Sequence, residues 1–202
     1  MDDDQFIDIV NKAIGFSGPL SAEEKTKALN LVAGHVLSLL RDALACFRNA
    51  SFGTSVFLSI TALEETAKAE VLVYRDSKKP RSAGRDPLMN HKSKHQIAVR
   101  TTTFLGRLPA LLGDEACHRL QSEADSGDLK NLRELALYVH PTDSGLASPR
   151  DAISRSRSRE MLLLALESAD DLLVGYTNES YSFGTEIEAL WKEVIATVEI
   201  DD

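Results

Sequence analysis

Apolar residues recur at intervals of three and four along most of this chain, a spacing that places them on one face of an α-helix. The first long example follows a capping-box pattern, Ser21 to Glu24, and extends to about residue 50. Gly53 separates it from a second long helix that we expect to end near residue 75. The positions predicted to face the core are Leu29, Val32, Val36, Leu40, Ala43 and Phe47, then Val56, Ile60, Leu63, Ala67 and Val71.

The other apolar segments are shorter, and Gly, Pro and Ser separate them. We expect helices over 6–14, 90–112, 114–124, 128–139, 148–176 and 185–198, with loops at 77–87 and 141–147. The predicted inward residues are Ile97, Thr101, Phe104, Leu105 and Leu108 in the helix over 90–112, and Ile187, Leu190, Trp191 and Val194 in the last helix. No alternating strand pattern of useful length appears. The prediction is therefore an all-α, antiparallel helical bundle.

A chain of 202 residues can bury one sizeable core, so we predict one domain over residues 1–202. It divides into an N-terminal helix and linker (1–20), a core bundle (21–176) and a C-terminal covering helix (177–202). A hydrophobic content of 43% with 27% charged residues is ordinary for a globular protein. Apolar runs are far shorter than the roughly 20 residues that span a bilayer. Because the first residues are also acidic, unlike a secretory signal, we expect a cytoplasmic protein without membrane contact.

Charge is unevenly distributed. The segment 75–107 contains nine Lys or Arg residues against two Asp residues, while the whole chain has a net charge of −8. Such a basic segment can neutralise phosphates locally, or it can be a solvated loop without a nucleic-acid role. Cys46 and Cys117 have neither the spacing of a zinc site nor that of a disulfide framework, and we interpret both as small core residues.

Three charged residues interrupt the second long helix. Glu64 and Lys68 lie four residues apart and Glu65 and Lys68 three apart, so all three groups are expected to meet within one turn beside the apolar face. An exposed intrahelical pair of this kind contributes only about 0.3–0.5 kcal/mol. If the three groups are instead partly buried and structural, loss of Glu65 or Lys68 would cost about 2 kcal/mol or more, because it leaves a buried charge without its partner.

The Leu63-Glu-Glu-x-x-Lys-Ala69 pattern resembles the AbiV branch of the HEPN superfamily. Further matching elements are His91-Lys-x-Lys-His95 after the basic segment, and Leu137-Tyr-Val139 ahead of a helix that begins at a proline. The resemblance covers roughly residues 33–176. It implies a HEPN-type helical bundle, a role in defence against phage, RNA cleavage that halts translation, and a homodimer. RNA is then the expected substrate and a phage-encoded protein a candidate activator.

HEPN ribonucleases are identified by an Arg followed, after four to six residues, by a His. Arg133 and His140 fit this pattern, and in a continuous helix they would project to nearly the same side. Arg85 and His91 also fit, but Pro87 disfavours a helix through them. We therefore predict Arg133 and His140 as the catalytic residues, with Glu64, Glu65 and Lys68 supporting them. The alternative is an Arg on a solvated face and a His that caps a helix C-terminus.

The segment after the basic loop has two further interpretations. His91, Lys92, Lys94, His95 and Arg100 are predicted to bind RNA through its phosphates. His91 and His95 could also combine with Glu64 or Glu65 in a two-His, one-carboxylate metal site, but the neighbouring lysines oppose a dication, so we predict neither a metal nor another cofactor. The alternative function is a non-enzymatic module that binds a phage or host protein through the Glu64–Lys68 face.

Overall fold

The computed structural model describes residues 21–74, 90–104, 106–143 and 145–197; the predicted helix over 6–14 and the loop at 77–87 lie outside this part of the chain. Its elements are α2 (Ala22–Arg48), α3 (Phe52–Tyr74), α4 (His91–Arg100), α5 (Leu108–Leu112), α6 (Asp114–Ser126), α7 (Asp128–Leu135), β1 (His140–Thr142), β2 (Gly145–Ala147), α8 (Pro149–Ala152), α9 (Arg155–Leu173) and α10 (Asn178–Ala196). These described elements form a mostly helical bundle, as predicted.

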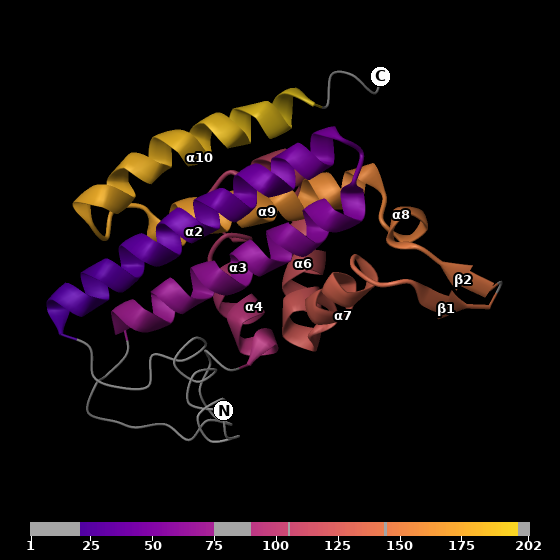
Figure 1. The fold of residues 1–202 in the computed structure, drawn as a ribbon, viewed down its shortest axis with the longest axis horizontal. Helices are drawn as coiled ribbons and strands as arrows, with labels where there is room; N and C mark the ends of the chain where they lie inside the picture. The colour runs from indigo at the N-terminus through magenta and orange to yellow at the C-terminus, as the bar shows by residue number, and fades with distance from the viewer. Residues whose placement is uncertain (1–20, 75–89, 105, 144, 198–202) are drawn as a thin grey trace, which may run out of the picture.

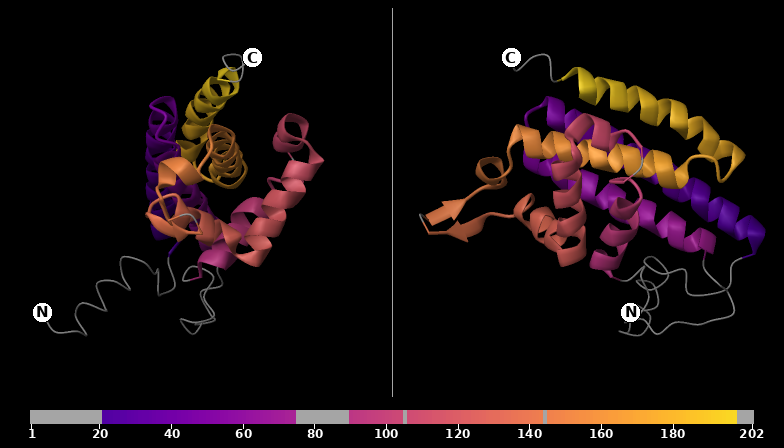
Figure 2. Two further views of the ribbon diagram at one scale, coloured as in Figure 1. Left: turned by 90° about the vertical axis from the view of Figure 1, so that its right-hand side faces the viewer. Right: turned by 180° about the vertical axis from the view of Figure 1, so that it is seen from behind.

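The four longest helices form the body of the molecule (Figure 1). α3 packs against α2 and α9, and α10 covers both α2 and α9. The shorter helices α4 and α7 pack on α3, α6 packs on α4 and α7, and α5 lies between α6 and α9 (Figure 2). α3 therefore contacts both the long bundle and the layer of short helices.

The predicted core of the two long helices is confirmed. All six inward residues predicted for α2 are buried, as are Val56, Ile60, Leu63 and Ala67 of α3; the side chain of Val71 lies outside the described part. α3 is also buried beyond this stripe, at Ser55, Ser59 and Thr66. A helix that is buried on most of its surface lies at the centre of a fold.

By length and apolar composition α2 also meets the criterion for a membrane-spanning helix. Core helices of globular folds meet the same criterion, and α2 places ten side chains in the core of this bundle.

Two predicted helices are interrupted. The helix expected over 90–112 stops at Arg100, and Gly106, with φ +85°, turns the chain before α5 begins. A positive φ is a conformation that glycine adopts without strain. Thr101 and Phe104 are consequently exposed, contrary to the prediction, whereas Leu108 is buried and Ile97 packs on the core. Leu105 lies outside the described residues.

The helix expected over 148–176 is two helices. Ser148 begins the single turn of α8, and Ile153 then adopts an extended conformation with its side chain in the core. Ser154 caps α9, its Oγ accepting a hydrogen bond from the Arg157 backbone N–H. The last helix, by contrast, begins earlier than predicted, at Asn178. Of its four predicted inward residues, Ile187, Trp191 and Val194 are buried, and Leu190 is partly buried against the core.

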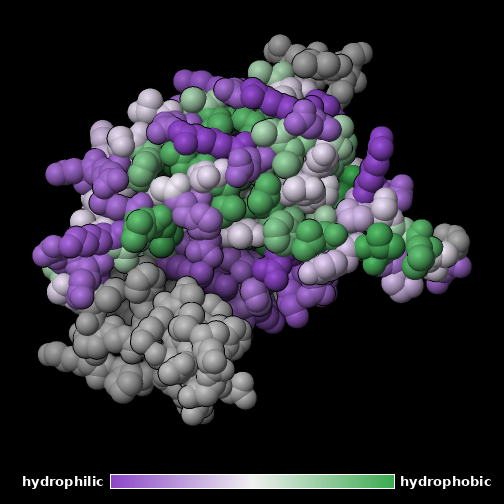
Figure 3. All heavy atoms as spheres, viewed as in Figure 1, coloured by the Kyte–Doolittle hydropathy of each residue, from purple (hydrophilic) through white to green (hydrophobic). Residues whose placement is uncertain are grey.

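The predicted loop at 141–147 is a short antiparallel hairpin, β1 and β2, in which His140 pairs with Ala147. We call residues 136–148 the arm; it projects from the body of the molecule (Figure 1). Leu137, Tyr138, Val139 and Leu146 are exposed on it, and apolar residues are visible at its surface (Figure 3). The expectation of no strand was therefore wrong here, although the hairpin is only three residues deep.

Candidate functional site

Glu64 is the centre of a buried polar site that joins three helices. It lies on α3 with 4% of its surface exposed, although a glutamate is rarely buried unless it is paired. Its neighbours Leu63 and Ala67 belong to the core, so the helix orientation that buries the apolar stripe also directs this carboxylate inward. A buried carboxylate requires hydrogen-bond donors from other elements.

Helix α4 supplies three of those donors. His91, Lys94 and His95 lie three and four residues apart and therefore share one face of the helix. His91 Nδ1 is 2.8 Å and Lys94 Nζ is 3.0 Å from Glu64 Oε2, while His95 Nε2 is 3.1 Å from Oε1. Asn90 begins α4 by accepting a hydrogen bond from the Ser93 backbone N–H, which fixes the position of this face.

Helix α7 supplies the fourth donor. Arg133 Nη1 is 3.0 Å from Glu64 Oε1, so each carboxylate oxygen receives two hydrogen bonds. The four donors come from two helices that are separate in sequence, and Arg133 is 69 residues from Glu64. We call Glu64, His91, Lys94, His95 and Arg133 the carboxylate cluster.

The cluster sets the charge of Glu64. Burial by itself raises the pKa of this carboxyl group, but the hydrogen bond from His95, the charge and hydrogen bond of Lys94, and the charge of His91 outweigh it. Together they lower the pKa from 4.5 to about 2. Glu64 is therefore an anion throughout the physiological range and holds its basic neighbours in fixed positions.

Glu65 and Lys68 form a separate pair. Lys68 Nζ donates to Glu65 Oε1 at 2.6 Å, and both side chains are largely buried, with 17% and 20% exposure for Lys68 and Glu65 respectively. The prediction that Glu64, Glu65 and Lys68 all meet was wrong for Glu64, which points to α4 and α7 instead. The predicted pair between Glu65 and Lys68, three residues apart, is confirmed.

The predicted catalytic residues do not share a helix. α7 ends at Leu135, and His140 is the first residue of β1, so the expected helix over 128–139 is too long. Pro141 explains why His140 itself is extended, because a residue that precedes proline disfavours the helical conformation; it does not explain why α7 already ends at Leu135. His140 is half-buried, and its Nδ1 is buried without a hydrogen-bond partner among the described residues.

The predicted RNA-binding residues divide into two groups. Lys94 and His95 are buried against Glu64, so in this structure their polar atoms cannot reach a phosphate. Lys92 and Arg100 are exposed, and 41% of the His91 side chain is exposed. Of the basic segment, residues 75–89 lie outside the described part. Arg107 pairs with Glu167 of α9, and its guanidinium lies 4.1 Å from the centre of the Trp191 ring. These contacts hold Arg107 against α9 and α10.

The metal-site alternative predicted that His91, His95 and Glu64 lie together, and they do, but as hydrogen-bonded partners. His91 and His95 do lie against Glu64, at hydrogen-bonding distances and with Lys94 and Arg133 on the same carboxylate. Two cations on the carboxylate oppose the binding of a dication. Within the described residues, no group of three or more His, Cys, Asp or Glu side chains has an arrangement that could hold a metal ion.

Sequence reasoning missed the connection between Arg133 and Glu64. The recurrence of basic residues at positions 91, 94 and 95 was a usable signal, because three such donors on one helix face need a shared anion. The metal-site alternative named Glu64 or Glu65 as a partner of His91 and His95, but nothing in the sequence indicated that α7 reaches the same carboxylate. That contact depends on how α4 and α7 pack on α3.

Comparison with known proteins agrees with the resemblance found in the sequence. The profile of the HEPN domain family described as AbiV matches residues 22–169, which is most of the chain. Neither a curated protein nor a solved structure matches. The matched region contains the carboxylate cluster, Arg133 and His140. Membership implies a role in abortive infection, the defence in which an infected cell stops phage growth. The chain belongs to the AbiV family of HEPN domains.

Proposed function

We propose that this protein acts in abortive infection as a ribonuclease in which Arg133 and His140 carry the chemistry. Family membership supports the defence role, and HEPN domains are typically ribonucleases. The observation that carries the proposal is the position of Arg133. One guanidinium nitrogen binds buried Glu64, while 23% of the side chain is exposed. Such a cation is held in place and still reaches the surface, as binding of a phosphate requires.

The proposed reaction uses the nucleophile that RNA itself carries. The 2′-hydroxyl oxygen attacks the adjacent phosphorus, the bond to the 5′-oxygen breaks, and a 2′,3′-cyclic phosphate forms. One group must accept the 2′-hydroxyl proton, another must protonate the leaving 5′-oxygen, and a cation must stabilise the charged phosphorane. His140 transfers a proton, and Arg133 binds the phosphoryl oxygens.

One chain supplies one Arg and one His, whereas the reaction needs both a proton acceptor and a donor. We propose that a homodimer with two-fold symmetry provides the second set, because an isologous interface brings identical residues together. Exposed Lys92, Arg100 and His91 guide the RNA by its phosphates. Lys94 and His95 act as positioning residues through Glu64, and Glu65 with Lys68 supports the same helix.

Cleavage of RNA by the purified protein tests this proposal. His140→Ala and Arg133→Ala should each reduce the cleavage rate by about 10² to 10⁴-fold, the range for loss of one acid–base or charge-stabilising group. Lys130→Ala is the matched control, since Lys130 is an exposed cation on the same helix. Circular dichroism checks that each variant is folded, and EDTA should leave cleavage unchanged. If both variants cleave RNA and arrest growth as the control does, the ribonuclease assignment is wrong.

A second candidate function is a module that binds a phage or host protein. The face first predicted for this role contains Glu64, which is buried, and the Glu65–Lys68 pair, which is mostly buried. The arm is a better surface, because Leu137 is 43%, Val139 61% and Leu146 78% exposed. Exposed apolar residues that gather on a projecting element are typical of an interaction site. Loss of phage defence in arm variants that still cleave RNA would favour this function.

A further inference from the structure

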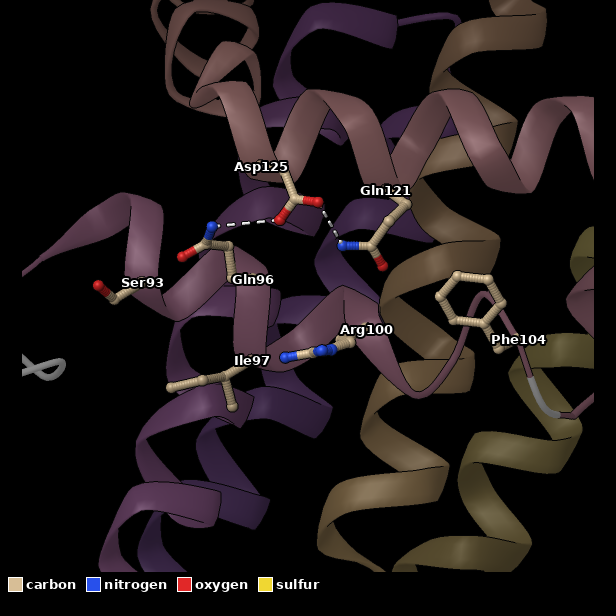
Figure 4. A pocket seen from close by; sticks show the side chains of 7 residues that line it. All are labelled: Ser93, Gln96, Ile97, Arg100, Phe104, Gln121 and Asp125. Carbon is tan, nitrogen blue, oxygen red and sulfur yellow. Dashed lines mark hydrogen bonds between the residues drawn. The ribbon is translucent and has the colours of Figure 1, made fainter.

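The face of α4 opposite the carboxylate cluster lines a pocket of about 550 Å³, shared with α6. This volume is within the range of about 300–1,000 Å³ typical of small-molecule sites. His91, Lys94 and His95 point to α3, whereas Gln96 and Arg100, one helical turn apart, point into the pocket (Figure 4). The pocket and the carboxylate cluster therefore share a helix but no side chain.

The carboxylate of Asp125 is fixed at one side of this pocket. Gln96 Nε2 donates to its Oδ1 at 3.1 Å, and Gln121 Nε2 donates to its Oδ2 at 3.2 Å. Gln121 is itself oriented, because its Oε1 accepts a hydrogen bond from Thr103 at 3.2 Å. A carboxylate has about four acceptor positions, so Asp125 can accept two further hydrogen bonds. It thus presents two parallel acceptors to a ligand.

Arg100 and Phe104 supply the other two features of the pocket. Arg100 is exposed and lies across from Asp125 in the close-up view; within the described part of the chain it makes neither an ion pair nor a hydrogen bond (Figure 4). Phe104 is 59% exposed, and its ring contacts His118 edge-on at 6.3 Å between centres. An unpaired guanidinium is suited to a phosphate, and an exposed ring to the face of a base.

We propose that this pocket binds a guanine nucleotide. Guanine presents two adjacent N–H donors, N1–H and N2–H, on its Watson–Crick edge, and these match the two oxygens of Asp125. Adenine and cytosine place a ring-nitrogen acceptor at that edge, which the carboxylate repels, and uracil has a single N–H between two carbonyl oxygens. Phe104 stacks on the base, and Arg100 binds the phosphate.

The nucleotide can be free or part of an RNA strand. If the nucleotide is part of an RNA strand, the pocket would give the proposed ribonuclease a preference for substrates that contain guanine. Only this RNA form of the proposal rests on the proposed function. Binding of a free nucleotide does not depend on cleavage, because a mononucleotide with only a 5′-phosphate has no phosphodiester bond to break. The two sources are therefore separable by experiment.

Isothermal titration of the full chain with 5′-GMP and 5′-AMP tests the proposal. We expect saturable binding of GMP, at least about tenfold tighter than AMP, since a mismatched pair of hydrogen bonds costs about 1–3 kcal/mol. Arg100→Ala should weaken GMP binding about tenfold, and Asp125→Asn should remove the preference for GMP over AMP. Arg150→Ala, at an exposed arginine on α8, is the control and should bind like the wild type.

A second titration uses four short uncleavable oligonucleotides, 2′-O-methylated throughout, one of which contains guanine. If the oligonucleotide that contains guanine binds more tightly than the other three, the ligand of the pocket is RNA. If GMP binds and none of the oligonucleotides does, the ligand is a free nucleotide. Absence of saturable GMP binding at millimolar concentration overturns the proposal, as does equal binding of GMP by the Arg100→Ala variant. Neither result bears on Arg133 or His140, because no cleavage is measured.

Discussion

At the scale of single residues, Glu64 has the largest effect on its surroundings. Its buried carboxylate receives hydrogen bonds from three cationic or imidazole groups of α4 and from the guanidinium of Arg133. Lys94 is itself only 6% exposed. Removing the anion leaves that ammonium group buried without its counter-charge, which is more costly than losing an ordinary hydrogen bond.

Replacement of Glu64 by Gln should lower the free energy of unfolding by about 3 kcal/mol at pH 7. The variant keeps the shape of the side chain and loses only its charge, so urea denaturation measures the electrostatic contribution. Lys27→Gln, at an exposed residue of α2 paired with Glu23, is a control expected to change stability by less than about 1 kcal/mol.

The stability difference between wild type and Glu64→Gln should depend on pH, in a direction that the pKa of Glu64 sets. The folded pKa of Glu64, about 2, lies below its ordinary value of 4.5, so the stabilisation from the ionised form is complete above pH 4.5. It is lost as the pH falls from 4.5 towards 2, by about 3 kcal/mol in total. The difference between wild type and Glu64→Gln should therefore narrow on acidification through this range. A difference that stays constant down to pH 3 would contradict the buried ion cluster.

At the scale of elements, the start of α3 determines where the arm leaves the bundle. A Cβ atom at Gly53 would lie 2.7 Å from the Ala136 carbonyl oxygen and 2.8 Å from the Pro149 Cβ. Ala136 is the first residue of the arm, just after α7, and Pro149 is the first residue of α8, directly after the arm. The absence of a side chain at Gly53 thus allows both ends of the arm, and with them His140, to approach the core helix.

Gly53→Ala should destabilise the protein by about 1–3 kcal/mol, because the backbone on the far side must move. Gly34→Ala is a matched control in the long helix α2, where an added Cβ meets no atom within 4 Å. That variant should be neutral or more stable by up to about 1 kcal/mol, since alanine favours a helix interior over glycine. Thermal unfolding compares the two. Equal melting temperatures for the two variants would mean that the contact is not tight.

Cap residues and prolines determine the other element boundaries. The sequence pattern joined α8 to α9, because both segments have helical spacing and Ser148 is a strong start signal. It could not weigh the gain from placing Ile153 in the core, which extends the chain for one residue and requires a second cap at Ser154. The extended conformation of His140 was predictable, since it precedes Pro141, but the end of α7 at Leu135 was not.

At the scale of the whole molecule, we propose that the arm is the surface through which two copies associate. It projects from the bundle and exposes Tyr138, Val139 and Leu146 beside His140 (Figures 1 and 3). If the second copy of the site comes from a partner chain, an interface here would place two His140 residues near a two-fold axis.

We expect light scattering at micromolar concentration to give about twice the chain mass of 22.1 kDa. Leu146→Asp should shift the protein to the monomer, because a charge in an apolar interface is desolvated without a partner. Leu31→Asp is the matched control, since Leu31 on α2 is 75% exposed and Leu146 is 78% exposed. A wild-type monomer, or equal dissociation by both variants, would exclude the arm as the dimer surface.

The sequence by itself determined the helical class, the long helices, their inward residues and the family. These follow from local information, namely apolar periodicity, caps and a motif within one helix, each of which involves residues fewer than about ten apart. It also identified Glu64, His91, Lys94, His95 and Arg133 as candidates one by one. The preferred role of each followed its neighbours in the chain, which is why Glu64 was paired with Lys68 and was grouped with His91 and His95 only in the metal-site alternative.

Only the tertiary structure decided which of these residues meet. Glu64, Lys94 and Arg133 share a site because α4 and α7 pack on the same side of α3, and this arrangement is fixed by burial of apolar surface on three helices at once. Polar residues on such helices follow the packing and then pair with whatever the other helices bring. The pocket beside Arg100 and the course of the arm past Gly53 arise in the same way, from contacts between segments that no local pattern connects.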